Sequence, residues 1–442
     1  MEDQDSQTHN GLAAIDNCCE HGVRPTAAPL LDHKQFRQQG SEMVNYVADY
    51  LESIEKRKVF PTVPPGYLSL LLPKEAPQQP EPWEDVMADI ERVIMPGITH
   101  WHHPRFHAYF PAGTSYPSMC ADILTNGIGC IGFSWASSPA CTELEVVMMD
   151  WLAKLLQLPE QFISGKNSGG FIQATCSDAT LLALFSARNR SIHKYQTEHP
   201  GASVYEAASK LVGYYSDQAH CSVERAGLIS MLRLRPIVTD CTYEMRGDDL
   251  QRAIEQDLEN GLLPFFCTAT LGTTASCAFD RLAELGPVCN QYDLWLHVDA
   301  AYAGSSFICP EYRPLLDGIE YATSFVFNPH KWLLVNFDCS CAWYKDVNWV
   351  MKSFCVDPVY LRHRYFGEAP DFRGDNNATK RLYEAIEEDG RIHMIPSEFH
   401  HPAPIFFIRF AVCYHSATRD HIEFAFDVIQ EMTDQVLVST SC

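Results

Sequence analysis

The sequence predicts an α/β fold in which a mostly parallel β-sheet is covered by helices on both faces. Two observations indicate this class. Between residues 116 and 373, short apolar segments typical of strands alternate with segments whose apolar residues recur at helical spacing. The apolar segments are continuous, as expected for strands buried on both faces. Strands and helices that alternate in this way build parallel sheets, which bind ligands at the carboxyl ends of their strands.

The strands are expected at 211–215, 234–238, 264–270, 294–298 and 324–327, with a further strand in "FIQAT". Helical spacing of apolar residues predicts helices in "DATLLALFSAR", "GDDLQRAIEQDLENG" and "RLAELGPVCNQY", which lie between these strands. The order strand, helix, strand is therefore repeated along this part of the chain.

Three further regions flank this core. Residues 1–34 lack periodicity and are expected to be a disordered tail. Residues 35–115 are expected to form an N-terminal helical arm, whose two amphipathic helices are joined by Pro-rich connectors. The large domain then spans 116–373. Residues 374–442 are expected to form a small α+β domain, with a helix in "ATKRLYEAIEEDG", a strand pair around "IHMIPS" and "FFIRFAVCY", and a closing helix.

Composition disfavours two classes of partner. The chain has 442 residues, of which 46% are hydrophobic, and its formal net charge is −23. A protein this acidic is not expected to bind nucleic acid or an anionic membrane surface. The apolar runs are shorter than the roughly 20 residues that a membrane helix needs. The 17 cysteines are scattered without a CxxC pair and the chain opens with acidic, polar residues, so we expect reduced thiols and a cytoplasmic location.

One lysine stands out because it lies between two apolar runs. Lys331 follows the strand at 324–327 and precedes "LLVNFDCS", which we expect to form a second buried strand. Taken alone, such a lysine can bury its stem and keep its ammonium in water.

Asp299 directly follows the strand at 294–298; taken alone, it fits a helix N-cap or a turn. If these strands are neighbours, the amine and the carboxylate meet at one edge of the sheet. Such a pair suits pyridoxal phosphate, because lysine forms a Schiff base with it and aspartate keeps its ring nitrogen protonated.

A phosphate group also needs a binding site at this edge. Thr175, Cys176 and Ser177 open the helix after "FIQAT", where free N–H groups and the helix dipole favour an anion. Ser177 is expected to be the N-cap, and capping alone is the alternative explanation. Thr274 follows another strand, with turn formation as its alternative. His220 opens a helix just after a strand, where an imidazole could cover a flat ring; a purely structural histidine is the alternative.

The motifs "FNPHKW", "HVDAAYAG", "DQAHCSVERAGL", "ATLGTT" and "GFSWASSPACTELE" together resemble the group II pyridoxal-phosphate decarboxylases, which include the aromatic-L-amino-acid, tyrosine and histidine decarboxylases. The resemblance runs from about Phe36 to Arg373 and continues more weakly to the end. It implies a fold-type I PLP-dependent transferase fold, pyridoxal 5'-phosphate as cofactor, and a cytoplasmic homodimer. The implied reaction releases CO2 from an aromatic L-amino acid.

The resemblance also assigns roles to individual residues. Lys331 is the implied Schiff-base lysine, Asp299 the partner of the ring nitrogen, and His220 the histidine stacked on the ring. Tyr360, in "FCVDPVYLRHRYFGEAPDFR", matches the proton-donating tyrosine of the family's mobile catalytic loop. The implied cofactor contacts are Thr175, Cys176, Ser177, His220, Thr274, Asp299, Ala301, Asn328, His330 and Lys331. Relatives often carry Ser-Ala-Ser where this chain has Thr-Cys-Ser.

The segment "HWHHPRFHAYFPAG" matches the substrate-side strand of the family. The implied substrate contacts are Trp101, Tyr109, Phe110, Ala112 and Phe133, of which Trp101 or Phe133 could come from a partner subunit. The four histidines of this segment lack acidic neighbours and the HExxH pattern, so we expect no metal.

Three features separate the branches of the family. Aldehyde synthases, which resemble this chain, usually carry asparagine where it has His220. The histidine-specific branch commonly reads "NPSKW", whereas this chain reads "NPHKW", and "HPRFHAYFPAG" and "IHMIPS" look most like the tyrosine branch. Tyrosine or DOPA is therefore favoured as substrate, with tryptophan derivatives, histidine decarboxylation and aldehyde synthesis as alternatives.

One departure concerns the C-terminal region. After "DFR", the family continues with a basic helix and further elements, whereas this chain proceeds to "GDNNATKRLYEAI" and omits several dozen residues. A second hypothesis follows, in which the chain is a truncated, non-catalytic isoform that binds the cofactor or dimerises with a full-length partner.

Overall fold

The computed structural model describes residues 32–354, 379–399, 405–410 and 418–439. The chain divides into two compact units, Met1–Tyr109 and Phe110–Cys442. Nearly all of the predicted tail, and all of the predicted catalytic loop except Phe354, lie outside the described residues, and Tyr360 is among those outside. The predicted domain boundaries at 115 and 373 remain predictions.

The first unit is helical, as predicted for the arm. Its α-helices are α1 (His33–Glu52), α2 (Tyr67–Leu71) and α3 (Trp83–Asp89). Asp32 caps α1, because its carboxylate accepts hydrogen bonds from the backbone N–H groups of Lys34 and Gln35. Among the described residues of this unit, the buried apolar side chains are Ile54 and Val93. The arm therefore has very little core of its own.

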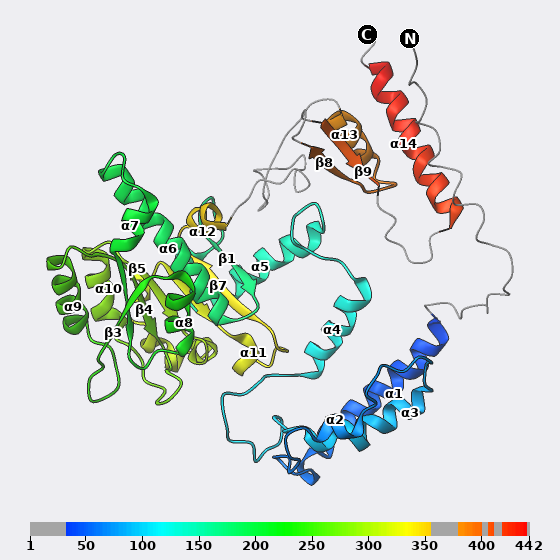
Figure 1. Ribbon diagram of the computed structural model, residues 1–442, viewed down its shortest axis with the longest axis horizontal. Helices are drawn as coiled ribbons and strands as arrows, with labels where there is room; N and C mark the ends of the chain where they lie inside the picture. The colour runs from blue at the N-terminus through cyan, green and yellow to red at the C-terminus, as the bar shows by residue number, and fades with distance from the viewer. Residues whose placement is uncertain (1–31, 355–378, 400–404, 411–417, 440–442) are drawn as a thin grey trace, which may run out of the picture. The chain divides into compact units, whose positions relative to one another are not determined.

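The second unit contains a seven-stranded sheet with the order β1-β7-β6-β5-β4-β2-β3 (Figure 1). Strand β7 runs antiparallel to its two neighbours, and the other neighbouring pairs are parallel. The predicted mostly parallel sheet is confirmed. The strands are β1 (Gly169–Gln173), β2 (Leu211–Ser216), β3 (Arg233–Ile237), β4 (Leu263–Thr270), β5 (Trp295–Asp299), β6 (Ser324–Phe327) and β7 (Ser340–Tyr344).

Helices cover both faces of this sheet. One core cluster joins the sheet to α5 (Pro139–Leu155), α9 (Gly247–Glu259) and α10 (Leu282–Gln291). A second cluster joins it to α6 (Cys176–Glu198), α7 (Val204–Lys210), α8 (Cys221–Ser230) and α12 (Val347–Phe354). Helix α4 (Tyr116–Ile128) precedes α5 and contributes no buried side chain. The inner strands of the sheet are thus buried between two helical layers, which explains their continuous apolar sequences, whereas the edge strands β1 and β3 are more exposed.

The segment after Lys331 differs from the prediction. The lysine lies in the short helix α11 (Pro329–Trp332), and strand β7 begins only at Ser340. Leu334 has the left-handed backbone angle φ of 57°, and the side chains of Leu334 and Phe337 are 60% and 65% exposed. The expectation of a buried strand directly after the lysine is therefore wrong, because the chain turns at the surface before it re-enters the sheet.

The last elements are α13 (Thr379–Asp389), β8 (Ile395–Phe399), β9 (Ile405–Arg409) and α14 (Arg419–Ser439). Strands β8 and β9 pair in antiparallel orientation. A separate small core, which consists of Ile386, Met394, Val428 and Met432, lies among these elements. The order helix, strand pair, helix matches the predicted α+β region. None of the helices in the described part of the chain is long and apolar enough to cross a membrane.

Candidate active site

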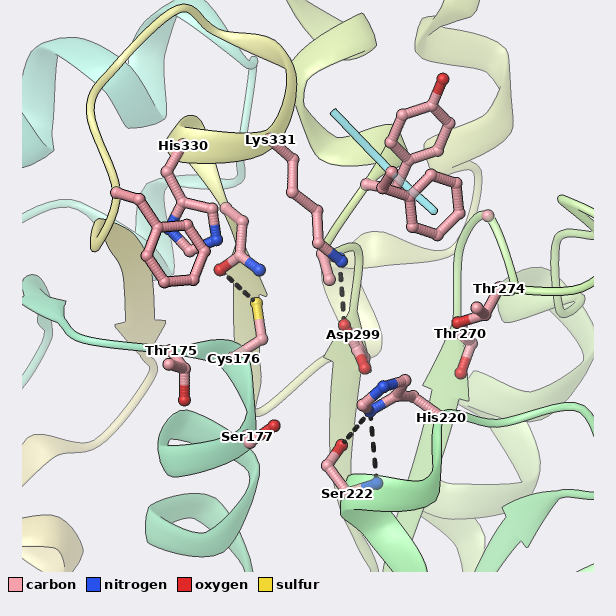
Figure 2. A pocket seen from close by; sticks show the side chains of 16 residues that line it. Thr175, Cys176, Ser177, His220, Ser222, Thr270, Thr274, Asp299, His330 and Lys331 are labelled. Carbon is pink, nitrogen blue, oxygen red and sulfur yellow. Dashed lines mark hydrogen bonds between the residues drawn. The ribbon is translucent and has the colours of Figure 1, made fainter. Parts of the chain in front are cut away.

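A pocket of about 200 Å³ opens at the carboxyl ends of β4, β5 and β6 (Figure 2). Ten predicted cofactor-site residues line it together, although they are spread from Thr175 to Lys331 in the sequence. The full lining is Phe110, Thr175, Cys176, Ser177, His220, Ser222, Thr270, Gly272, Thr274, Asp299, Ala301, Tyr302, Asn328, His330, Lys331 and Phe337.

Lys331 reaches this pocket because β6 ends at Phe327, just before the short helix that carries the lysine. Asn328 caps α11 and Pro329 occupies its first position, where a missing N–H is harmless. The N–H group of Lys331 donates to the carbonyl of Asn328 at 3.0 Å, which fixes the backbone of this turn. Its Nζ atom lies 4.9 Å from the centre of the Phe110 ring. Figure 2 shows the side chain extending into the pocket on the side of Asp299.

Asp299 is the last residue of β5, and its side chain is only 3% exposed. It lies opposite Thr270 of β4 in the sheet register. Its Oδ1 atom accepts a hydrogen bond from the N–H group of Ala301 at 3.0 Å. Burial raises the pKa of this carboxyl group, and the Ala301 hydrogen bond and the positive charge of Lys331 counteract that rise. A buried carboxylate of this kind favours a cationic ligand beside it.

The first turn of α6 forms the opposite wall of the pocket. Thr175 is its N-cap, since the threonine Oγ1 atom accepts from the N–H group of Asp178 at 3.2 Å. The expectation that Ser177 is the N-cap is therefore wrong; Ser177 lies inside the first turn. The N–H groups of Cys176 and Ser177 belong to the helix start, where a 23-residue helix presents its positive dipole end. This wall is suited to an anion such as phosphate.

Asn328 is oriented by two donors behind the pocket. Its Oδ1 atom accepts from the Cys176 thiol at 2.9 Å and from the Ser340 hydroxyl. Because the amide oxygen is occupied in this way, the amide N–H groups are on the other edge of the side chain, available to a ligand. Asn328 is 5% exposed, so this orientation is held in a nearly dry environment.

Two further predicted residues lie on loops that follow β2 and β4. His220 is the N-cap of α8, and its Nδ1 atom accepts from the N–H group of Ser222 at 3.2 Å. The structural role that the sequence left open for His220 is therefore present, and its ring also lines the pocket. Thr274 lies on an exposed turn at the pocket rim. Figure 2 shows His220 between Asp299 and the α8 helix start.

His330 lines the pocket beside Lys331 and is almost fully buried. Its Nδ1 atom accepts from the N–H group of Cys339 at 2.8 Å, which links α11 to the segment before β7. Burial lowers the pKa of this imidazole, and the charge of Lys331 lowers it further. A neutral ring next to the lysine follows from this environment.

An aromatic stack lies beside the amine. The ring of Phe110 stacks on Tyr302 with centroids 4.1 Å apart, and Tyr302 stacks on Trp332 at 5.0 Å. Offset stacking of this kind contributes about 0.5–1.5 kcal/mol beyond simple burial. The stack therefore fixes the Phe110 ring next to the lysine.

The other predicted substrate contacts do not lie in this pocket. Ala112 is half-buried and Phe133 is 57% exposed, and neither lines it. Trp101 and Tyr109 belong to the first unit, where their rings stack at 5.3 Å and remain exposed. Sequence reasoning missed five lining residues, namely Ser222, Thr270, Gly272, Tyr302 and Phe337. Thr270 and Tyr302 lie inside the quoted motifs "ATLGTT" and "HVDAAYAG", so membership of a motif at a strand end was the available signal.

The pocket fits pyridoxal 5'-phosphate. Thr270 has a buried Oγ1 atom without a hydrogen-bond partner among the described residues, and it lines the pocket beside Asp299. An amine, a buried carboxylate and a helix start are the three groups that the aldehyde, ring nitrogen and phosphate of this cofactor require. In the described part of the chain, no group of three His, Cys, Asp or Glu side chains could hold a metal ion.

Fold and pocket together define a pyridoxal-phosphate-dependent enzyme of the α/β class. The model of the "Pyridoxal-dependent decarboxylase conserved domain" matches residues 65–402. The chain belongs to this family, is a carboxy-lyase, and uses pyridoxal 5'-phosphate as its cofactor.

Among its relatives, the chain is 57% identical over 380 residues to the aromatic-L-amino-acid decarboxylase of Drosophila simulans, covering 86% of this chain and 74% of the relative. The rat (Rattus norvegicus) aromatic-L-amino-acid decarboxylase is 45% identical over 478 residues, which cover 92% and 99% of the two chains. Among solved structures, Catharanthus roseus tryptophan decarboxylase in complex with L-tryptophan has a TM-score of 0.71 at 31% identity, covering 92% of this chain and 99% of that one.

Proposed function

We propose that this protein decarboxylates an aromatic L-amino acid to the corresponding amine and CO2, with tyrosine or DOPA as the favoured substrate. The observation that carries the proposal is the convergence of Lys331, Asp299 and the α6 helix start on one pocket with an aromatic wall. The names of these relatives support the aromatic class of substrate. Aromatic walls favour a flat ring over the side chains of most other amino acids.

Different residues of the chain are proposed to bind different parts of the cofactor. In the proposal, the Lys331 amine binds its aldehyde carbon, Asp299 binds its protonated ring nitrogen, and His220 lies over its ring. The N–H groups of Cys176 and Ser177 and the amide of Asn328 bind its phosphate, while Ala301, Thr274 and His330 line the remaining surface. When bound, the cofactor supplies a ring that accepts the electron pair left when CO2 departs.

Side chains of the protein are also proposed to stabilise charge on the cofactor, to orient the substrate and to donate a proton to the product. The Asp299 carboxylate stabilises a positive charge on the ring nitrogen, and its burial strengthens that attraction. The Phe110 ring, fixed by Tyr302, orients the aromatic side chain of the substrate. Tyr360, outside the described residues, is proposed to donate the proton that the product carbon receives. Trp101, Tyr109, Ala112 and Phe133 are proposed to complete the substrate pocket, in part from a partner subunit.

A homodimer is part of the proposal. The helices α4 and α5 and their connecting loop carry many exposed apolar side chains, which is unusual for a monomer. Among them are Ile123, Leu124, Ile128, Ile131, Phe133, Leu144 and Trp151. We also propose a cytoplasmic location, supported by the twelve free cysteines of the described residues.

A shortened C-terminal region is the second part of the proposal. The alignment to the rat enzyme spans 478 positions and 99% of that enzyme but 92% of this chain of 442 residues, which supports a missing internal segment. The missing residues leave the small core of four side chains to stabilise this region. We therefore expect a slower or less stable enzyme than the full-length relatives, or at the limit a chain that binds cofactor without turnover.

A panel of amino acids tests the proposal. The purified full chain, loaded with cofactor, is incubated with tyrosine, DOPA, 5-hydroxytryptophan and histidine, and CO2 and amine are quantified. We expect equal amounts of CO2 and amine from tyrosine or DOPA and little from histidine. Aldehyde with consumption of oxygen would favour aldehyde synthesis, an activity named in a structural neighbour, Rhodiola rosea 4-hydroxyphenylacetaldehyde synthase. Bound cofactor without CO2 release would favour the non-catalytic isoform.

A further inference from the structure

A continuous chain of buried polar side chains runs behind the pocket. The indole N–H of Trp295 donates to the Ser324 hydroxyl at 2.8 Å, and that hydroxyl lies 2.8 Å from His297 Nδ1. His297 Nε2 lies 3.3 Å from the Thr180 hydroxyl, which donates to the carbonyl of Cys176 at 2.9 Å. The four side chains are at most 1% exposed, so water does not compete with these bonds.

The direction of each hydrogen bond in this chain can be assigned. Trp295 can only donate, so the Ser324 oxygen accepts its proton and is free to donate its own to His297 Nδ1. The imidazole then carries its hydrogen on Nε2 and donates to Thr180. The Thr180 hydroxyl accepts this bond and donates to Cys176. Every polar hydrogen has an acceptor in this arrangement.

The opposite tautomer of His297 satisfies fewer groups. With hydrogen on Nδ1, the Ser324 oxygen receives two hydrogens, and its own hydroxyl proton has no described acceptor. A buried hydroxyl left unsatisfied is unfavourable, because it has lost its hydrogen bond to water without replacing it. Burial also lowers the pKa of His297 to about 3, so the ring is neutral at physiological pH. The Nε2–H tautomer is therefore the one that this environment selects.

The chain of bonds joins the two walls that hold the cofactor. His297 and Asp299 are two residues apart on β5, so both side chains are on the same face of the strand. Cys176 is the first residue of α6, and its N–H group belongs to the phosphate-binding turn. We call the hydrogen-bonded side chains of Trp295, Ser324, His297 and Thr180 the relay. The relay links the strand that carries Asp299 to the N-terminal end of α6, where the anion site lies.

We propose that neutral His297, acting through Thr180, is a positioning residue that sets the first turn of α6 relative to Asp299. The spacing of these two walls must match the distance between the ring nitrogen and the phosphate of one rigid cofactor. A wall that shifts loses hydrogen bonds at one end or the other, so the relay contributes to cofactor affinity without touching the cofactor. The inference rests on the proposed cofactor-binding site. It adds the residues that position the two walls of that site.

A role in packing alone makes the opposite prediction. Valine has nearly the shape of threonine but no hydroxyl, whereas serine keeps the hydroxyl and loses a methyl group. If Thr180 only fills space, Thr180→Val is harmless and Thr180→Ser is the damaging change. If the relay positions α6, the order is reversed, because Thr180→Val leaves the His297 N–H group without an acceptor.

The test measures cofactor affinity rather than turnover. Apo protein of wild type, Thr180→Val and Thr180→Ser is titrated with pyridoxal phosphate, and the absorbance of the bound form gives the dissociation constant. We expect an increase of about tenfold for Thr180→Val, equivalent to one hydrogen bond, and a change of less than about twofold for Thr180→Ser. Thermal unfolding of each apo protein shows whether a variant is folded.

A second matched pair keeps the test decisive if Thr180→Val does not fold. Glutamine and methionine have similar shapes, but only glutamine carries an N–H donor where the imidazole has Nε2. We expect His297→Gln to bind the cofactor within about threefold of wild type and His297→Met to lose about tenfold.

Two results would overturn the inference. Equal affinity in Thr180→Val and wild type, or an equal loss in Thr180→Ser and Thr180→Val, would show that the hydroxyl does not position α6. Likewise, equal losses in the two His297 variants would contradict it. Failure of wild type itself to bind the cofactor would remove the proposed cofactor seat along with the relay, so the two failures are distinguishable.

Discussion

The Nζ atom of Lys331 lies 4.9 Å from the centre of the Phe110 ring, which is itself stacked on Tyr302. A lysine ammonium over an aromatic face is stabilised by the ring quadrupole by about 0.5–2 kcal/mol. The same ring faces the space into which a substrate must enter. Phe110 therefore contacts the reactive amine and, in the proposal, the aromatic side chain of the substrate.

Replacement of this ring tests its role in substrate binding. We expect Phe110→Leu to raise KM for the aromatic amino acid about tenfold with a smaller effect on kcat, because stacking orients the substrate in all bound states. Phe110→Tyr keeps the ring and is the matched control, with an expected change of less than about threefold. Steady-state kinetics measure both. Equal KM values for Phe110→Leu and wild type would place the substrate ring elsewhere.

The orientation of Asn328 rests on two donors, which predicts non-additive effects. Cys176→Ala should change cofactor affinity by less than about threefold, because Ser340 still donates to the Asn328 oxygen. Ser340→Ala alone should behave similarly, since the thiol remains. The double variant frees the amide to rotate, and we expect a loss of about tenfold in a cofactor titration. Strictly additive losses would show that the two donors act independently of the amide.

Asp280 predicts a pH dependence of stability. Burial raises its pKa to about 7, against the opposing effect of hydrogen bonds from Thr270 and Met245, and the carboxylates of Glu244 and Asp217 raise it further. The folded state thus holds a proton that the unfolded state releases near pH 4. This contribution to stability is present at low pH and is lost as pH rises through about 7, with a size of up to about 4 kcal/mol.

Asp280→Asn removes this titration. We expect the melting temperature of the wild-type apo protein to fall more steeply between pH 5 and pH 7 than that of the variant. The variant should be less stable at pH 6, because an amide offers only one acceptor to the two backbone N–H groups. Parallel curves for the two proteins would show that Asp280 does not titrate in this range.

The small C-terminal core predicts local instability. Ile386 is fully buried in a cluster of only four buried residues, so Ile386→Ala should cost about 2–5 kcal/mol and open this region. Ile422 on α14 is 41% exposed, and Ile422→Ala is the matched control with little expected effect. Hydrogen exchange should increase over 379–399 and 418–439 in Ile386→Ala while the large sheet is unchanged. Similar exchange in both variants would indicate that this core does not stabilise the region.

Much of the fold was predictable because strand burial and helix spacing leave direct traces in the sequence. The continuous apolar strands and the positions of Lys331 and Asp299 after strand ends follow from such traces. The turn after Lys331 was not predictable, because Leu334 and Phe337 are apolar yet exposed. Composition alone cannot distinguish an apolar surface loop from a buried strand.

The site was predictable where a residue carries characteristic chemistry. The amine, the carboxylate and the helix start can be recognised in the sequence from residue type and position. The importance of Thr270 and Tyr302 is visible only from contacts between distant segments. The choice of N-cap between Thr175 and Ser177 depends on backbone angles that either residue can adopt. The structure shows Thr175 as the N-cap. The buried links of His297 to Thr180 and Ser324 are likewise tertiary, because the partners are 117 and 27 positions apart in the sequence.

The role of Lys331 is tested directly by locating the covalently bound cofactor. The protein loaded with pyridoxal phosphate is reduced with borohydride, digested, and examined by mass spectrometry. We expect the phosphopyridoxyl mass on the peptide that contains Lys331 and none on any peptide of Lys331→Ala. A label on a different lysine of the wild-type protein, or none at all, would contradict it.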